Sequence, residues 1–244
     1  MSDPRAAFLA IGDELLSGKV DDTNSRHAIA RLRGLGIALR RVWLVPDEID
    51  EIAFAVSDSS RRFEHVFTSG GVGPTHDDVT FEGVARAFDQ GIVRHPEIGR
   101  RIHDYFGALT NEALLMMADV PAEAELVRIV DGLVPVLRIR NVYVLPGVPE
   151  LFVRCFDAVV ENLSGRPFHL VRLHTHHDEG MIADALRETQ DRFVAVAIGS
   201  YPRFGHADYH VLVTLESRDA EALGAAVAHL RALLPAAWIE PPPG

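Results

Sequence analysis

The chain has 244 residues, of which 48% are hydrophobic and 24% are charged, the proportions of an ordinary soluble globular protein. Its formal net charge is −11 and it has no run of five or more basic residues, which argues against a nucleic-acid or anionic-membrane partner. Because the N-terminal apolar run, residues 6–11, is too short for a signal peptide or a membrane span, and the single cysteine, Cys155, cannot form an internal disulfide, we expect a cytoplasmic protein.

The first half of the chain alternates short apolar runs with segments of helical periodicity. The expected strands are residues 6–12, 42–45, 65–70 and 141–147, and the expected helices are residues 21–36, 48–62, a segment starting near Phe81 and one starting at Pro149. Repeated strand–helix units of this kind predict a mostly parallel sheet covered by helices on both faces, a three-layer α/β/α fold. Such folds bind ligands at the carboxyl ends of their strands.

A break at residues 162–167, NLSGRP, separates this part, residues 1–165, from a second pattern. The rest reads as strand, helix, strand, strand, helix and short strand. That βαββαβ order predicts a small ferredoxin-like α+β domain over residues 166–240. Residues 241–244, PPPG, are expected to form a disordered tail.

The stretch TSGGVGPTHDDVT, residues 68–80, follows one of the expected strands. A glycine-rich turn before a helix offers backbone N–H groups to an anion such as a phosphate. Asp77 and Asp78 come directly after this turn and would repel the anion unless a divalent cation lay between them. Thr75 and Asp78 also have the spacing of a helix capping box, which is a purely structural explanation for one of the two aspartates.

Two further loops lie at the same edge of the predicted sheet. Asp13 and Glu14 come directly off the first strand, and Asn24 lies near the start of the next helix. The turn LPGVPE, residues 145–150, follows the last strand of the first half. Because the loops at the carboxyl ends of parallel strands meet in one crevice, Asp13 is a functional candidate, whereas Asp21 and Asp22 are equally well explained as helix caps.

These motifs together resemble a known family. Residues 68–80 are similar to the signature T-G-G-x-G-P-T-x-D-D-x-T of the molybdopterin-binding (MoaB/Mog) domain superfamily, with Ser69 in place of the first Thr. Residues 11–32 and 145–150 resemble loops of its competence/damage-inducible protein A (CinA) branch. The second half looks like the small domain of CinA proteins and of eukaryotic FAD synthases. The C-terminal amidase domain of longer CinA proteins has no counterpart here, so deamidation of nicotinamide mononucleotide is not expected.

The resemblance implies a ligand pocket formed by these loops. In the MoaB/Mog branch such a pocket binds molybdopterin or its adenylylated form. The CinA domain is associated with metal-dependent pyrophosphatase activity on ADP-ribose, and the FAD synthase domain with FAD hydrolysis. Carried over to this chain, Asp77, Asp78 and Asp13 are the expected catalytic carboxylates, and Asp77 and Asp78 would hold Mg²⁺, Co²⁺ or Mn²⁺. The expected ligand-binding residues are Gly12, Glu14, Asn24, Ser69, Gly70, Gly71, Gly73, Pro74, Thr75, Pro146 and Gly147.

The leading hypothesis is therefore a metal-dependent hydrolase of a nucleotide pyrophosphate such as ADP-ribose or FAD. The first alternative is a non-hydrolytic binder of molybdopterin, or an adenylyl-transfer protein of molybdenum cofactor biosynthesis. The second is a regulatory or structural protein with a decayed site, because residues 130–142 lack the N-x-x-G-x-A-P-G stretch of CinA proteins and keep only Val134 and Pro135 in its place. The resemblance also implies a homo-oligomer, either a dimer or a trimer.

Overall fold

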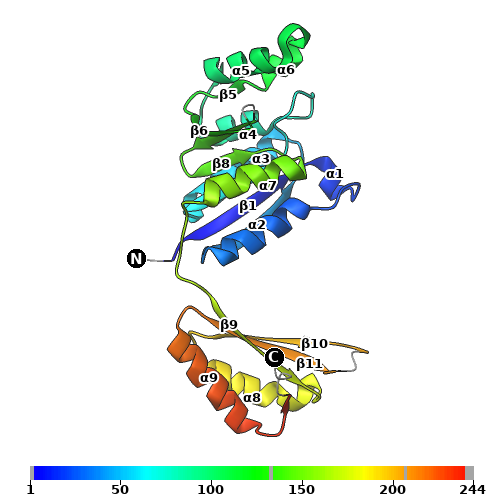
Figure 1. Cartoon of the computed structure of the whole chain (residues 1–244), viewed down its shortest axis with the longest axis vertical. Helices are drawn as coiled ribbons and strands as arrows, with labels where there is room; N and C mark the ends of the chain where they lie inside the picture. Colours follow the sequence, from blue (N-terminus) through cyan, green and yellow to red (C-terminus); the bar gives the residue numbers. More distant parts are fainter. Residues whose placement is uncertain (1–2, 132–133, 206–207, 240–244) are drawn as a thin grey trace. The chain divides into compact units, whose positions relative to one another are not determined.

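The structure is a computed structural model that describes residues 3–131, 134–205 and 208–239. The chain divides into two compact domains, residues 1–165 and 166–244 (Figure 1). The predicted disordered tail, residues 241–244, lies outside the described residues. A membrane-spanning helix is not found among the residues that the structure describes.

The larger domain is built on a six-stranded sheet with the strand order β2-β1-β3-β8-β7-β6. The strands are β1 (Arg5–Ile11), β2 (Ala38–Val45), β3 (His65–Ser69), β6 (Glu125–Val130), β7 (Val134–Ile139) and β8 (Val142–Leu145). Strands β2, β1, β3 and β8 pair in parallel, whereas β7 and β6 pair antiparallel. The prediction of a mostly parallel sheet is confirmed, and the antiparallel pair β6 and β7 is an addition that the periodicity did not predict.

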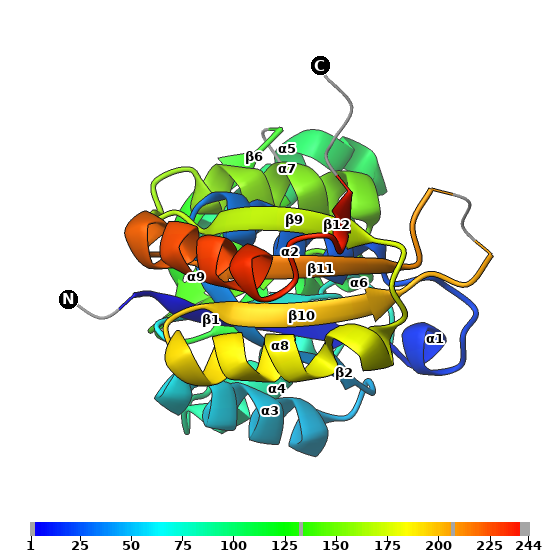
Figure 2. The ribbon, with the colours of Figure 1, turned by 90° about the horizontal axis from the view of Figure 1, so that it is seen from below.

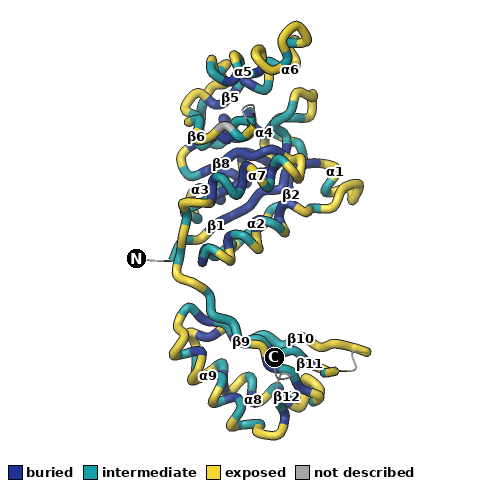
Figure 3. Tube along the Cα trace, viewed as in Figure 1, coloured by how far each residue is buried: buried dark blue, intermediate teal, exposed yellow. Residues whose placement is uncertain are grey.

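Strand β1 shows why the sheet needs a helical layer on each face. Residues Ala6 to Ile11 are all buried, and the tube of β1 is accordingly dark blue in Figure 3. Alternate residues of a strand point to opposite faces. Accordingly, Leu9 and Ile11 pack with α3 (Ile49–Arg62) and α4 (Thr80–Ala87), whereas Phe8 packs with α2 (Thr23–Gly34) and α7 (Pro149–Val160). The continuous apolar run in the sequence thus corresponds to a strand covered on both sides.

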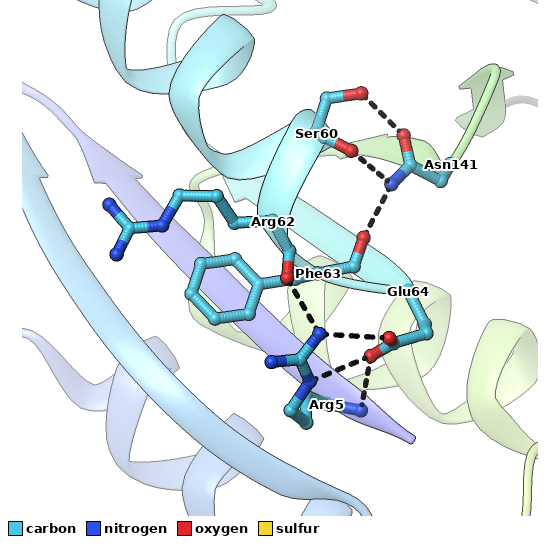
Figure 4. A network of polar contacts seen from close by, with 6 residues as sticks. All are labelled: Arg5, Ser60, Arg62, Phe63, Glu64 and Asn141. Atoms are coloured by element: carbon cyan, nitrogen blue, oxygen red, sulfur yellow. Dashed lines mark hydrogen bonds and ion pairs between the residues drawn. The ribbon is translucent and has the colours of Figure 1, made fainter. Parts of the chain in front are cut away.

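The amino ends of the central strands are tied together by polar contacts (Figure 4). The Arg5 guanidinium donates to the Glu64 carboxylate at 3.1 Å and to the Arg62 carbonyl at 3.0 Å. The Asn141 amide donates to the carbonyls of Ser60 and Phe63 at 3.0 and 2.8 Å. These contacts join the C-terminal turn of α3 to β1 and β8, and they leave the opposite, carboxyl edge of the sheet to the loops of the candidate site.

The segment between α4 and β6 forms a small subdomain of the larger domain. It contains β4 (Ile92–Arg94), α5 (Pro96–Phe106), a 3₁₀ turn (Gly107–Leu109), α6 (Glu112–Met116) and β5 (Asp119–Pro121), with β4 and β5 paired antiparallel. Ile98 and Ile102 of α5 are buried in the same core as α3 and α4. The subdomain is therefore packed onto the sheet domain through an apolar contact.

The smaller domain has the predicted element order. Its elements are β9 (His169–Thr175), α8 (Glu179–Arg192), β10 (Ala197–Pro202), β11 (Val211–Ser217), α9 (Ala220–Leu233) and β12 (Trp238–Ile239). They form a four-stranded antiparallel sheet in the order β10-β11-β9-β12, with α8 and α9 on one face (Figure 2). Along β11, Val211, Val213 and Leu215 are buried against these helices, and the residues between them are half-buried. This alternation is expected of a sheet covered on one face only.

Candidate functional site

Loops from four adjacent parallel strands meet at the carboxyl edge of the larger sheet. The Gly12 amide donates to the Val45 carbonyl at 3.0 Å, and the Gly70 amide donates to the Leu145 carbonyl at 3.2 Å. These bonds extend the pairing of β1 with β2 and of β3 with β8 by one residue. The glycine-rich loop and the two neighbouring loops therefore converge, as the sequence analysis predicted.

The first two glycines of the loop are required by close packing. Gly70 has φ 111° and Gly71 has φ 62°, both in the region that favours glycine. A side chain on Gly70 would overlap the Ile11 carbonyl, and one on Gly71 would overlap the Thr80 hydroxyl. The Thr80 hydroxyl, which is fully buried, donates to the Gly70 carbonyl at 2.8 Å. The last residue of the motif thus fixes the path of its first two glycines.

The two aspartates of the motif occupy different environments. The Asp78 carboxylate accepts hydrogen bonds from the Gly73 amide at 2.7 Å, the Thr75 amide at 2.9 Å and the Thr75 hydroxyl. The Asp77 side chain is 61% exposed. The nearby Thr75 hydroxyl and the backbone amide of Asp77 itself hold the pKa of Asp77 below its ordinary value. Asp78 therefore shapes the loop, whereas Asp77 offers an ionised carboxylate to the solvent.

The interpretation of Thr75 and Asp78 as a helix capping box is wrong. Helix α4 begins at Thr80, its N-cap is Val79, and no side chain caps it. Asp78 instead closes a turn that precedes the helix, because the Asp78 amide donates to the Thr75 carbonyl at 3.2 Å. By contrast, Asp22 does cap a helix, since its carboxylate accepts from the Ser25 amide at the start of α2.

A carboxylate that the sequence analysis missed lies beside Asp13. The Asp47 carboxylate accepts from the Asp13 amide at 2.9 Å, and the Asp47 amide donates to the Asp13 carboxylate at 3.4 Å. Partial burial, together with the negative charges of Glu14, Asp13 and Asp77, raises the pKa of Asp47. Asp47 follows β2 after a single proline, so, like Asp13, it is a carboxylate at the carboxyl end of a parallel strand.

This acidic group has a composition that a divalent cation accepts, since Mg²⁺ and Mn²⁺ prefer carboxylate oxygens. Among the described residues, however, no three Asp, Glu, His or Cys side chains converge as a preformed metal site. Mg²⁺ is commonly bound by one or two carboxylates together with water and substrate phosphates. The residues therefore fit a cation that arrives with a phosphate ligand, and they do not form a closed structural site.

A cavity of about 540 Å³ lies beside the glycine-rich loop. One side of it is lined by the loop, including Gly70, Gly71, Gly73 and Pro74. Apolar side chains from several helices and strands of the larger domain form much of the remaining wall, namely Phe81, Ile98, Ile102, Phe106, Met117, Val134, Pro135, Val144, Val148 and Leu151. Its charged lining residues are Glu14 and Asp78, both acidic. A ligand in this cavity therefore meets the glycine-rich loop on one side and an apolar surface on the other.

A second, smaller recess of about 50 Å³ lies next to this cavity. It is lined by Asn24 and Ser69, and it shares Glu14 and Gly147 with the large cavity. The Asn24 amide donates to the Ser69 hydroxyl at 2.9 Å and to the Gly147 carbonyl at 2.8 Å, and the Ser69 hydroxyl donates to the Pro146 carbonyl at 3.1 Å. Asn24 and Ser69 thus connect three loops that are far apart in the sequence.

The predicted site residues are distributed over both cavities. Those in the lining of the large cavity are Glu14, Gly70, Gly71, Gly73, Pro74, Asp78, Pro146 and Gly147, and the recess adds Asn24 and Ser69. The structure places Gly12, Asp13, Thr75 and Asp77 outside the lining of both. Asp13 and Asp77 nevertheless lie near the rim, because both are close enough to Asp47 to raise its pKa, and the Asp47 carboxylate lies 3.5 Å from where a Cβ of Gly71, a lining residue, would be.

Comparisons with known proteins agree with this architecture. Residues 7–165 match the family of the probable molybdopterin binding domain, and residues 167–243 match the middle domain of FAD synthase. A probable FAD synthase of Caenorhabditis elegans is 33% identical over 94% of this chain, which spans only 50% of that relative. A protein of Archaeoglobus fulgidus is 32% identical, with 93% of this chain and 96% of that protein aligned.

The larger domain also has a solved structural neighbour. The crystal structure of the protein CinA from Thermoplasma acidophilum superposes with a TM-score of 0.61 and 29% sequence identity. The match covers 66% of this chain and 99% of that protein. From the converging strand-end loops, the glycine-rich signature and these matches, we conclude that the chain belongs to the family of the probable molybdopterin binding domain and is similar to CinA.

Proposed function

We propose that the larger domain binds a nucleotide with a pyrophosphate group, such as FAD or ADP-ribose, and hydrolyses the pyrophosphate bond with the help of a divalent cation. Two observations support a nucleotide ligand. Relatives that align over most of this chain are named probable FAD synthases, and the smaller domain matches the middle domain of FAD synthase. The chain spans only 50% of the probable FAD synthase of Caenorhabditis elegans, so FAD synthesis is the named activity of a longer protein. For this chain, the ligand class and the reaction are both proposals.

The observation that carries the proposal is the combination of surfaces at the loop site. The large cavity offers apolar walls for a ring system and a glycine-rich backbone for a phosphate. Among the described residues that line the two cavities, the charged side chains are acidic and there is no Lys or Arg. A pyrophosphate bound here therefore needs a cation from solution to balance its charge.

The residues at the rim suit different tasks. Asp77 is exposed and has a lowered pKa, so it is ionised at neutral pH and suited to bind a cation that bridges to the pyrophosphate. Asp13 and Asp47 add carboxylate oxygens on the side of β1 and β2. Asp78 accepts from the amides of Gly73 and Thr75 and so fixes the conformation of the glycine-rich loop. A bound divalent cation would lower the pKa of an attacking water and stabilise the charge that develops on the phosphate.

The proposal is tested by incubating the full chain with ADP-ribose or FAD and Mg²⁺, Mn²⁺ or Co²⁺, and measuring AMP by chromatography. We expect AMP release that EDTA abolishes and added cation restores. Asp77→Asn should reduce the rate at least about 100-fold, in the range for the loss of one transition-state contact. Asp184→Asn, which removes a 96% exposed carboxylate on α8, is the matched control and should leave the rate unchanged. Equal rates in both variants would refute the role of Asp77.

A second function is supported by the family match and the FAD synthase names, namely binding or adenylyl transfer without hydrolysis. It predicts a bound pterin detectable by fluorescence after purification, or pyrophosphate release from ATP in the presence of FMN. Absence of both, combined with AMP release from FAD, would favour hydrolysis. Absence of ligand-induced thermal stabilisation by any of these compounds would favour a site that has lost its function.

A further inference from the structure

The orientation of the Asn24 side chain is determined by its hydrogen bonds. Both acceptors of its amide group, the Ser69 hydroxyl and the Gly147 carbonyl, lie on the same side of it. A carbonyl can only accept, so a flipped Asn24 would bring two oxygens together at Gly147. The side-chain oxygen of Asn24 therefore points away from both partners.

This oxygen has no hydrogen-bond partner in the described part of the chain, although Asn24 is only 8% exposed. Leaving a buried acceptor unsatisfied is costly, and buried polar groups in proteins are nearly always paired. Asn24 lines the recess of about 50 Å³, which has room for a few water-sized groups. We infer that a bound molecule supplies the missing donor.

The other lining groups restrict the chemistry of that molecule. Glu14, Asp21 and Asp22 line the same recess, so its charged groups are carboxylates that accept hydrogen bonds and repel a phosphate. The described residues include no preformed site of three converging Asp, Glu, His or Cys side chains, so a metal ion would enter the recess only with further ligands from water or a phosphate. The recess therefore suits an uncharged group with several donors, such as neighbouring hydroxyls.

The position of the recess connects it to the proposed substrate. Glu14 and Gly147 line both the recess and the large cavity, so the two spaces are immediate neighbours. We propose that the recess binds a sugar diol of the ligand and that Asn24 recognises it as a hydrogen-bond acceptor. This proposal rests on the nucleotide ligand proposed above, and it makes Asn24 a residue that selects ribose-containing or ribityl-containing substrates.

No natural substitution removes the Asn24 oxygen alone, so the first test changes the ligand and keeps the native chain. The side-chain amide signals of Asn24 are assigned in ¹⁵N NMR spectra by their loss in Asn24→Ala. D-ribose is then titrated, with tetrahydrofurfuryl alcohol, which keeps the ring and the hydroxymethyl group but lacks the diol, as the matched compound. We expect D-ribose to shift the Asn24 signals and to bind at least about threefold more tightly, within the range for one neutral hydrogen bond.

Two outcomes would overturn the proposal. One is equal binding of the two compounds. The other is an Asn24 signal that D-ribose leaves unmoved, which would mean that water alone occupies the recess. In Asn24→Ala the ribose-induced shift of the Gly147 amide should disappear, whereas Asn111→Ala, which removes the remote N-cap of α6, should retain it. Because D-ribose has no pyrophosphate, ribose binding without AMP release would refute the proposed hydrolysis and leave the diol site standing.

Discussion

Because Asp78 is hydrogen-bonded to the glycine-rich loop and Asp77 is exposed, we expect the two aspartates to differ in their contribution to stability. Replacing Asp78 with Ala removes the acceptor of two backbone amides and one hydroxyl in the glycine-rich loop. The three bonds are partly exposed, so water replaces part of each. With roughly 1 kcal/mol per bond, the expected loss is about 2–3 kcal/mol. In a domain of this size that corresponds to a decrease in Tm of about 4–12 °C.

Asp77→Ala is the matched control, because it removes the same group one residue earlier in the chain. The Asp77 side chain is 61% exposed, and its interaction with the Thr75 hydroxyl and its own backbone amide is open to water, so we expect the Tm of Asp77→Ala to change by less than about 2 °C. Differential scanning calorimetry of the full chain measures both values. Amide hydrogen exchange of Gly73 and Thr75 localises the effect, and it should accelerate at least tenfold in Asp78→Ala alone.

Two results would refute this reasoning. If both variants unfolded at the same temperature, the hydrogen bonds of Asp78 would not contribute to stability as argued. If the exchange of Gly73 and Thr75 were unchanged in Asp78→Ala, the carboxylate would not hold the loop, whatever the effect on Tm.

Three further predictions concern backbone packing, charge and the buried thiol. Gly70→Ala should lower the free energy of unfolding by at least about 3 kcal/mol in a denaturant titration, because its new methyl group would overlap the Ile11 carbonyl. Gly99→Ala in α5, where the methyl group has room, should raise it by about 0.5–1 kcal/mol. Similar values for both variants would contradict the close packing at Gly70. Because the pKa of Asp47 is raised in the folded protein, its ionisation costs stability as the pH rises through and above the ordinary aspartate range. Asp47→Asn should therefore have a higher Tm than the native chain at pH 7 and lose this advantage at pH 3, whereas parallel pH profiles would exclude the effect. Burial raises the pKa of Cys155 to about 11, so alkylation by iodoacetamide at pH 8 should be slow in the folded protein and rapid in denaturant, and equal rates would show that the thiol is accessible.

Much of the fold follows from local patterns in the sequence. The apolar run of β1 predicts a strand covered on both faces, and the helical periodicity around Ile52 and Val56 predicts α3, because burial imposes a period of two or of 3.6 residues on each element. Strands β6 and β7 lie beyond such reasoning. Their described side chains range from exposed to buried, and their place in the sheet depends on the pairing of β7 with β8 and of β6 with β7.

The sequence by itself also determined which loops meet, because the carboxyl ends of parallel strands share one edge of the sheet. Only the tertiary structure decided what each residue does there. The contact of Asp13 with Asp47 joins residues 34 positions apart, and that of Asn24 with Gly147 joins residues 123 positions apart. The apolar wall from α5 is likewise a product of long-range packing. Asp77 and Asp78 are neighbours in the chain, yet the Asp78 carboxylate accepts from the loop amides whereas Asp77 is exposed. The three-dimensional path of the backbone, and not the order of residues, sets the direction of each side chain.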